Sequence, residues 1–260
     1  MRDVLRELVR NARELVASGY YDAVEGSTRA EPAPSLVRAL RRHPTFPIIA
    51  EVKLASPGRP SLSLHPPKDL VRCYREGGAA ALSVLTEPNH FQGSLEHLRL
   101  ARGAGLPLLM KDIVVSESQI EAGARLGASA VLLIERVNRF KSLDADFDAL
   151  IEKAHRVGVE VLLEVSDDEE MRCATRRGVD LIGINQRDLT TLDVDGTKGE
   201  ALLREFRMRT DLPIIIMSGV SEARQLEAVR DLGADGALVG TALSSSPDPL
   251  GRLRGLAVGR

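Results

Sequence analysis

Several residue types are scarce in this chain, and each scarcity argues against a class of protein. The 260 residues include two cysteines, Cys73 and Cys173, and no tryptophan. The cysteines are far apart and show no CxxC or Cys/His spacing, so we expect free thiols in a reducing compartment and no metal site. No stretch approaches the ~20 consecutive apolar residues that a membrane span requires.

The N-terminal segment and the charge balance exclude further classes. Residues 1–10 read as a charged amphipathic helix and lack the continuous apolar core of a signal peptide. The formal net charge is only −2, which gives no electrostatic reason to expect a nucleic acid or a membrane as partner. No dinucleotide-binding fingerprint or Walker-type loop is present, so no nucleotide cofactor is expected. We therefore expect a soluble, cytoplasmic protein.

Lysine is also scarce, and two of the lysines stand at unusual places. The chain has 6 lysines against 29 arginines, so arginine normally supplies its positive charge. Lys53 closes the apolar run 47–53, and Lys111 closes the run 107–111. On a strand, Glu51 and Lys53 point to the same face, where desolvating them is costly unless they are paired or used. Because the pKa of lysine can be shifted far enough for proton chemistry, this pair is the first candidate for function.

What the chain does contain is a regular alternation of short apolar runs with amphipathic helical segments. Runs that are apolar on both faces and separated by helices are typical of parallel strands covered by helices. Eight such units favour a closed barrel over an open sheet, because ~250 residues is typical of a (β/α)8 barrel. The expected strands are 47–53, 80–85, 107–111, 129–134, 159–164, 180–184, 212–217 and 235–239.

The sequence therefore predicts an α/β protein, a (β/α)8 or TIM barrel with an N-terminal helical extension. We expect a single domain, residues 1–260, in which a helical cap at 1–46 precedes the barrel at 47–260. Glycines that come just before strands are expected to end the preceding helices in the left-handed conformation. These glycines are Gly127, Gly178 and Gly233.

Polar residues follow nearly every expected strand. In a barrel of this kind the chemistry collects at the carboxyl ends of the strands. For any one of these residues a place on the loop surface is the simpler interpretation, but their common position at one rim favours a site. They are Glu51 and Lys53, Thr86 and Glu87, Lys111 and Asp112, Glu135, Glu164, Asn185 and Arg187, Ser218 and Gly219, and Gly240 and Thr241.

Small residues after the seventh and eighth strands predict a phosphate site. Ser218 and Gly219 follow one strand, and Gly240 and Thr241 follow the other. Such residues expose backbone N–H groups near a helix start, which suits a phosphate dianion, and barrels commonly bind phosphate there. Ordinary turn chemistry is the alternative interpretation. Arg187 could add a fork of donors to the same phosphate.

Lys111 and Glu164 each have a structural and a functional interpretation. Lys111, next to Asp112, either forms an ion pair with a neighbouring carboxylate at the strand end or has a catalytic role. Inside a ring of carboxylates it would be a general acid or a Schiff-base amine. Glu164 is either a helix cap or rim salt bridge, or a catalytic carboxylate at a strand end. The residues alone leave these alternatives open.

Taken together, these segments resemble the indole-3-glycerol phosphate synthase family. The resemblance covers residues 47–250 in order and spacing, so it is more specific than any one motif. It is carried by 49–57 (IAEVKLASP), 82–87 (LSVLTE), 91–94 (FQGS), 109–115 (LMKDIVV) with 119–120 (QI), 163–165 (LEV), 183–189 (GINQRDL), 218–220 (SGV) and 246–249 (SPDP).

The resemblance implies a (β/α)8 barrel and a carboxy-lyase of tryptophan biosynthesis. Its substrate would be a small phosphorylated molecule, 1-(2-carboxyphenylamino)-1-deoxyribulose 5-phosphate. The enzyme would close this compound to indole-3-glycerol phosphate, with loss of CO2 and water, and would need no cofactor or metal. A preorganised ammonium fits this reaction, because ring closure builds negative charge on the ribulose oxygen.

The resemblance also implies roles for individual residues. Lys111 would be the general acid on the substrate carbonyl, and Glu164 would assist proton movement on the amine side or at dehydration. Glu51 and Lys53 would assist ring closure and dehydration, with Lys53 also near the phosphate. The remaining residues would bind and position the substrate: Asn185 and Ser218 its hydroxyl and carboxylate groups, Ser56, Arg187, Gly219, Gly240 and Thr241 its phosphate, and Phe91 its aromatic ring.

Three positions depart from the family pattern. Met217 stands where a glutamate is usual, Leu54 where a basic residue is usual, and Gln92 where glycine or asparagine is usual. Met217 matters most because it removes a carboxylate from the polar ring. We expect it to reduce or retune the activity and to leave the phosphate and aromatic sites intact.

Two other functions remain open at this level. Met217 and Leu54 would support a regulatory or scaffold barrel that binds the phosphate ligand without turnover. A sugar-phosphate isomerase or a lysine Schiff-base aldolase is the other alternative, and borohydride trapping would separate it, since the synthase forms no adduct on Lys111. We expect a monomer because no exposed apolar helix face is evident in the sequence.

Overall fold

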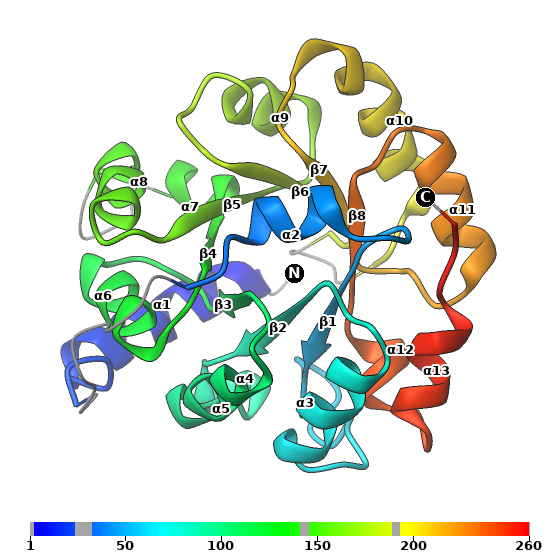
Figure 1. Ribbon diagram of the computed structural model, residues 1–260. Coiled ribbons are helices and arrows are strands. Elements are labelled where there is room, and N and C mark those ends of the chain that lie inside the picture. The colour runs from blue at the N-terminus through cyan, green and yellow to red at the C-terminus, as the bar shows by residue number, and fades with distance from the viewer. Residues whose placement is uncertain (1–2, 24–32, 141–145, 189–192, 260) are drawn as a thin grey trace.

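The computed structural model is a closed barrel of eight parallel strands (Figure 1). Each strand pairs with the next one in the chain, and β1 (Ile48–Val52) pairs with β8 (Gly236–Val239) to close the ring. Closure leaves no sheet edge exposed to water. The predicted (β/α)8 barrel with an N-terminal helix is confirmed. The structure describes residues 3–23, 33–140, 146–188 and 193–259.

Strands and helices alternate along the barrel, and the strand bounds differ from the expected ranges by at most two residues. The other strands are β2 (Ala81–Leu85), β3 (Leu108–Lys111), β4 (Ala130–Ile134), β5 (Glu160–Val165), β6 (Leu181–Asn185) and β7 (Ile214–Met217). The helices are α1 (Val4–Ala17), α2 (Leu36–Arg42), α3 (Pro67–Glu76), α4 (Pro88–Phe91), α5 (Leu95–Ala101), α6 (Glu117–Leu126), α7 (Glu135–Arg139), α8 (Phe147–Arg156), α9 (Asp168–Ala174), α10 (Gly196–Phe206), α11 (Ala223–Asp231), α12 (Thr241–Ser244) and α13 (Pro249–Gly255). Among the described residues, none of these helices is both long and apolar enough to cross a membrane.

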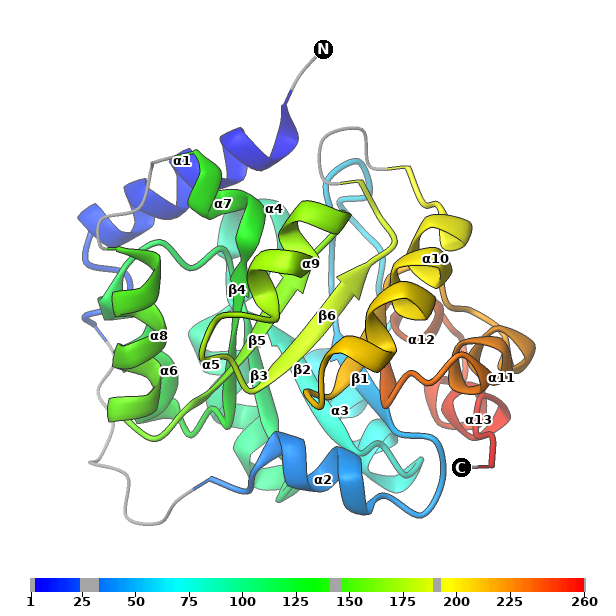
Figure 2. The ribbon, with the colours of Figure 1, turned by 90° about the horizontal axis from the view of Figure 1, so that it is seen from above.

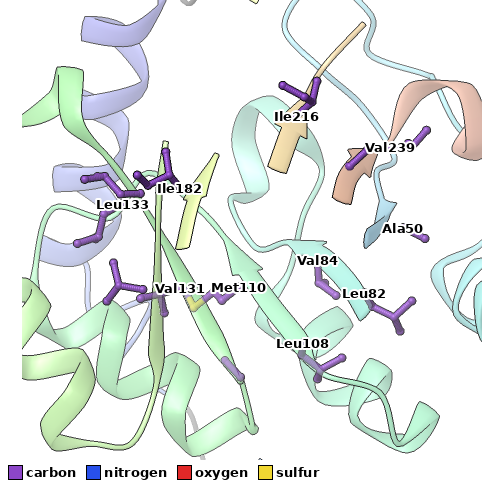
Figure 3. Close-up of a cluster of buried hydrophobic side chains, with 14 of the residues drawn as sticks. Ala50, Leu82, Val84, Leu108, Met110, Val131, Leu133, Ile182, Ile216 and Val239 are labelled. Atoms are coloured by element: carbon purple, nitrogen blue, oxygen red, sulfur yellow. The ribbon is translucent and has the colours of Figure 1, made fainter. Parts of the chain in front are cut away.

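Side chains of each strand alternate between the layer under the helices and the inside of the barrel. On β4, Val131 and Leu133 belong to the outer layer, whereas Leu132 and Ile134 belong to the inner one. Figure 3 shows side chains of the outer layer, with Leu82, Val84 and Ile216 among those it labels. Both faces of a strand are therefore buried, which explains why the strands read as continuous apolar runs.

The two helices that precede β1 lie at opposite ends of the barrel (Figure 2). Helix α2 lies at the amino ends of the strands, where the carboxylate of Glu160 accepts hydrogen bonds from Ser35 Oγ at 2.5 Å and from the backbone N–H groups of Leu36 and Val37 at 2.8 and 3.1 Å. Helix α1 lies across the carboxyl ends. The extension thus covers both openings of the barrel.

Buried polar side chains attach α1 and the turn that follows it to the barrel. Asn11 Nδ2 donates a hydrogen bond to Glu87 Oε1 at 2.7 Å. The Tyr21 hydroxyl and Thr86 Oγ1 both donate to Asp112 Oδ2, at 2.9 and 2.5 Å. Burial raises the pKa of the Asp112 carboxyl to about 6, against the opposing effect of these hydrogen bonds. The cap is therefore held by specific polar contacts as well as by its apolar face.

The predicted left-handed glycines are found at two of the three positions. Gly127 and Gly233 have φ angles of 90° and 95° and follow α6 and α11 closely. Gly178 is not among the residues with positive φ, so that prediction is wrong. Helix α9 already ends at Ala174, with Thr175 as its C-cap, and Gly178 lies beyond the turn that closes it.

Candidate active site

A cavity of about 530 Å³ opens at the carboxyl ends of the strands. All twelve site residues expected from the sequence line it, although they come from seven different strand ends or the connections that follow them. Side chains that are far apart in the sequence meet there because the barrel brings every strand end to one rim. The twelve are Glu51, Lys53, Ser56, Phe91, Lys111, Glu164, Asn185, Arg187, Ser218, Gly219, Gly240 and Thr241.

At the floor of the cavity one carboxylate lies between two lysines. Glu51 Oε1 is 3.5 Å from Lys53 Nζ, and Glu51 Oε2 is 3.9 Å from Lys111 Nζ. Ser83 Oγ also donates to Glu51 Oε2, at 3.5 Å. Glu51 is only 3% exposed, so its charge is compensated by these neighbours and not by bulk water. The three groups form a partly desolvated charge cluster with one excess positive charge.

Burial sets the acidity of Lys53. Desolvation lowers the pKa of its ammonium group, and the nearby charges of Lys111 and Arg187 lower it further, while Glu51 opposes the shift. A lysine whose pKa is lowered in this way can release a proton more readily than a surface lysine. The position of Lys53, one residue beyond the end of β1, thus gives it the property that the sequence predicted for it.

Side chains behind β1 fix the place where Glu51 and Lys53 leave the strand. Ser244 Oγ donates to the Glu51 carbonyl oxygen at 2.9 Å, and the Lys53 backbone N–H donates to Ser244 Oγ at 3.3 Å. The Tyr74 hydroxyl lies 3.1 Å from the same Ser244 Oγ. Gly240, on the neighbouring strand end, lies so close to Glu51 that a Cβ there would force the Glu51 carboxylate to shift.

A second carboxylate faces the cavity from β5. Asn185 Nδ2 donates to Glu164 Oε1 at 2.8 Å, and the Asn185 Oδ1 accepts the Arg187 backbone N–H at 3.0 Å. Burial raises the pKa of Glu164, while the Lys111 charge and the Asn185 hydrogen bond work in the opposite direction. A carboxyl group with a raised pKa can exchange protons nearer to neutral pH, which suits an acid–base residue.

Small residues line the opposite side of the cavity. Ser218 and Gly219 follow β7 with φ angles of 67° and 76°, so the chain turns sharply at the rim. The left-handed region is unusual for serine and is found where a turn or a site imposes it. Gly240 is the N-cap of α12 and Thr241 its first residue, and Arg187, which is half-buried, lines the same cavity.

Met217 occupies the inner side of β7 and is 1% exposed. Its side chain packs over Gly183 of β6, where a Cβ would collide with the methionine sulfur. It lines the cavity together with Leu238 of β8. The structure therefore has an apolar wall at the position where the resemblance leads one to expect a carboxylate.

Four polar residues that follow strands do not line the cavity. Thr86 donates to Asp112, which also accepts from Tyr21, and Glu87 accepts from Asn11 of α1. Glu135 is buried, accepts hydrogen bonds from Arg177 at 2.9 and 3.1 Å, and forms a structural ion pair with it. Each of these residues is held by hydrogen bonds to other side chains and serves the structure.

The cavity also contains residues that sequence reasoning did not assign to the site. Val4, Leu5 and Leu8 of α1 contribute apolar side chains, and Arg59 contributes a positive charge. The amphipathic pattern of α1 predicts an apolar face, but it does not predict which part of the molecule that face covers. Within the described segments no three His, Cys, Asp or Glu side chains are grouped so as to hold a metal ion.

Comparison with known proteins identifies the family. The family model of indole-3-glycerol phosphate synthase matches residues 5–256. An indole-3-glycerol phosphate synthase of Mycolicibacterium smegmatis is 39% identical over 245 residues, covering 92% of this chain and 85% of that protein. The indole-3-glycerol phosphate synthase 2 of Streptomyces coelicolor is 39% identical over 234 residues, covering 89% of this chain and 88% of that protein.

Solved structures at lower identity share the fold. An N-acetylmannosamine-6-phosphate 2-epimerase from Clostridium perfringens superposes with a TM-score of 0.63 at 17% identity, covering 85% of this chain and 95% of that one. A thiamine phosphate pyrophosphorylase from Pyrococcus furiosus gives 0.61 at 20% identity, covering 83% and 95%. These two likenesses concern the barrel alone. The family match over nearly the whole chain and the close relatives carry the assignment: the chain belongs to the indole-3-glycerol phosphate synthase family.

Proposed function

We propose that the cavity residues carry out the indole-3-glycerol phosphate synthase reaction in the roles that follow. The family is a carboxy-lyase of tryptophan biosynthesis, and its reaction is the ring closure, decarboxylation and dehydration of 1-(2-carboxyphenylamino)-1-deoxyribulose 5-phosphate. One observation supports the assignment of roles above the others. Two lysines share the single carboxylate of Glu51 in the same cavity that holds the Glu164–Asn185 pair.

Ring closure needs an acid at the substrate carbonyl. The ring carbon that bears the carboxylate forms a bond to the carbonyl carbon, and the π pair of the carbonyl moves to its oxygen. Lys111 donates a proton to that oxygen, and its charge stabilises the oxyanion as it develops. Glu51 keeps the two ammonium groups in place.

Decarboxylation and dehydration complete the reaction. As CO2 leaves, the electron pair of the broken bond restores the aromatic ring. The new hydroxyl group then leaves as water with a proton from Lys53, while Glu164 accepts a proton from the adjacent ring carbon. Over the whole cycle the two lysines give up two protons and Glu164 takes one, so one proton enters from solvent. That proton balances the charge of the lost carboxylate.

The remaining residues hold the substrate. Arg187 and the backbone around Gly219 and Gly240 bind the phosphate, together with Ser56 and Thr241. Asn185 and Ser218 position hydroxyl and carboxylate groups, and Phe91 lines the aromatic pocket. Binding energy from the phosphate, which does not react, can then orient the reacting end.

The test is incubation with the carboxyphenylamino-deoxyribulose phosphate while indole fluorescence is followed. We expect product from the wild-type chain and no borohydride-trapped adduct on Lys111. Absence of product would refute the proposed roles as a set, and a trapped adduct would replace acid catalysis at Lys111 with Schiff-base chemistry.

We also infer that the enzyme works as a cytoplasmic monomer formed by one domain, residues 1–260. Light scattering should give a mass near 28.2 kDa, and unfolding should be a single cooperative transition. A mass of twice that value at micromolar concentration, or two separate transitions, would contradict the inference.

A further inference from the structure

The connection between β1 and α3 carries an arginine to the cavity. In Figure 2 this connection, in light blue, rises above the carboxyl end of β1. Arg59, which belongs to this connection, lines the cavity. The Ser56 N–H donates to the Arg59 carbonyl at 3.0 Å, and the Arg59 N–H donates to the Ser56 carbonyl at 2.8 Å. This pair of bonds closes a tight turn, so the backbone of Arg59 is tied to a residue of the cavity wall.

Two further contacts fix the loop from outside the turn. The Leu62 N–H donates to the Leu54 carbonyl at 2.9 Å, which closes the base of the loop. Gln92 Nε2 donates to the Pro60 carbonyl at 2.7 Å, directly after Arg59. Gln92 itself is in the left-handed conformation, with a φ of 51°, and follows Phe91 of the cavity wall. Gln92, the C-cap of α4, therefore holds the loop at Pro60, the residue that follows Arg59.

Arg59 and Arg187 bring two guanidinium groups to the same cavity. Burial, and after it the positive charge of Arg59, lowers the pKa of Arg187, whereas Glu51 opposes the shift. Within the described parts of the chain no acidic side chain forms an ion pair with Arg59. Two guanidinium groups that reach one cavity from separate loops favour the binding of an anion between them.

We propose that Arg59 is a substrate-binding residue that forms, with Arg187, a two-guanidinium clamp on the substrate phosphate, and that Gln92 is the residue that positions it. This rests on the proposed function, which places the phosphate at the Arg187 side of the cavity. A phosphate dianion has oxygens enough for two planar forks of donors, and guanidinium groups match it better than ammonium groups do. The loop would then contribute to affinity for phosphorylated substrates and not to the chemical steps.

The test is steady-state kinetics together with inhibition by inorganic phosphate. For Arg59→Ala we expect KM and the inhibition constant of phosphate to rise together by about tenfold, with kcat within twofold of wild type. Arg59→Lys should recover part of the loss, because it keeps the charge but not the fork. Gln92→Ala should raise both constants by about threefold. Arg38→Ala, which removes an exposed arginine from α2 at the other end of the barrel, is the control and should change neither constant.

The outcomes separate this inference from the proposed function. If Arg187→Ala weakens phosphate inhibition and Arg59→Ala does not, the clamp is refuted and the phosphate site stands. If Arg187→Ala has no effect on phosphate inhibition, the phosphate site itself is wrong and the clamp falls with it. A double variant supports the clamp when its effect differs from the sum of the two single effects, as expected for two groups on one anion. Strict additivity would overturn it.

Discussion

Two glutamates of the same strand show how one barrel separates structure from chemistry. Glu160 is the first residue of β5, and Glu164 is the last but one. Because side chains alternate along a strand, both glutamates point to the inner side of the barrel. Glu160 lies at the amino end, under α2, where three donors of the Ser35–Val37 segment bind its carboxylate. Glu164 lies at the carboxyl end, under α1, where one side-chain donor, Asn185 Nδ2, holds it and it faces the cavity.

The difference lies in the neighbours and not in the residue type. A carboxylate whose acceptor sites are filled by fixed donors stabilises one arrangement of the chain. A carboxylate that is buried with fewer fixed donors has a raised pKa and retains acceptor capacity for a substrate proton. The amino end of the barrel thus supplies stability and the carboxyl end supplies reactivity, as in other barrels of this kind.

The largest effect on activity is expected at Lys111, which has no counterpart at the amino end of the barrel. Lys111→Ala removes the proposed acid and should lower kcat by about 10³-fold, with little change in KM, because the lost interaction belongs to the transition state. Steady-state assays that follow indole fluorescence measure both kcat and KM. Full activity in this variant would show that Lys111 is a structural partner of Glu51.

The direct contrast is between Glu164→Gln and Glu160→Gln. The first should lower kcat by about 10²-fold, since an amide cannot accept the proton. The second should leave kcat within twofold but lower the stability by about 1–3 kcal/mol, because the amide has one acceptor oxygen where the carboxylate has two and loses the charge that strengthens these bonds. Equal losses of activity would break the distinction between the two ends.

The pH profile sharpens the same contrast. Burial raises the pKa of Glu164, and a base works only when ionised, so kcat/KM should fall as the pH drops through that raised pKa. In Glu164→Gln this acidic limb should disappear, whereas in Glu160→Gln it should stay. Persistence of the limb in both variants would assign it to another group.

A smaller change is expected at the apolar wall of the cavity. Met217→Glu places a carboxylate where the thioether now packs over Gly183, near the lysines of the cavity floor. The added charge should raise the pKa of Lys53 and shift the pH optimum upward, with kcat changed by less than about tenfold. Burial of the new charge should also lower the melting temperature. An unchanged pH profile would show that residue 217 does not tune the lysines.

The smallest effect on activity is expected at Asp112, under the cap. Its pKa is raised from 3.8 to about 6, so the folded state binds this proton more tightly than the unfolded state does. Its contribution to stability is therefore complete below pH 3.8 and is lost as the pH rises through 6. Asp112→Asn should remove that dependence and keep kcat. Melting temperatures between pH 4 and 7 measure it, and an unaltered profile would contradict the shift.

Much of the barrel could be predicted because strands buried on both faces are short apolar runs whose ends carry polar residues. Glu51 and Lys53 share strand parity, and both reach the cavity as that parity requires. Asp112, the next residue after Lys111, has the opposite parity and faces away from the cavity, although the sequence analysis placed both at the rim. Beyond the end of a strand this alternation no longer holds strictly, so the rim could be predicted as a set but not residue by residue.

The positions of the cap and of the loops could not be predicted from the sequence, for a different reason. The helical pattern of α1 shows that Leu5 and Leu8 share a face, but nothing in the sequence says that this face covers the cavity. Arg59 lies in a segment without periodicity, where a charged residue is ordinarily solvated. Its place depends on the Gln92 contact with Pro60, which joins segments 32 residues apart.

The attachment of the cap has a consequence for the order of events during folding. Tyr21 and Asp112 are separated by 91 residues, and Ser35 and Glu160 by 125. Neither end of the barrel can be covered until that much of the chain has been synthesised and its strands have paired, and bringing such distant segments together has an entropic cost. Helix α1 is synthesised before all the barrel strands but can reach its native place only after they have paired, so the cavity is completed late in folding.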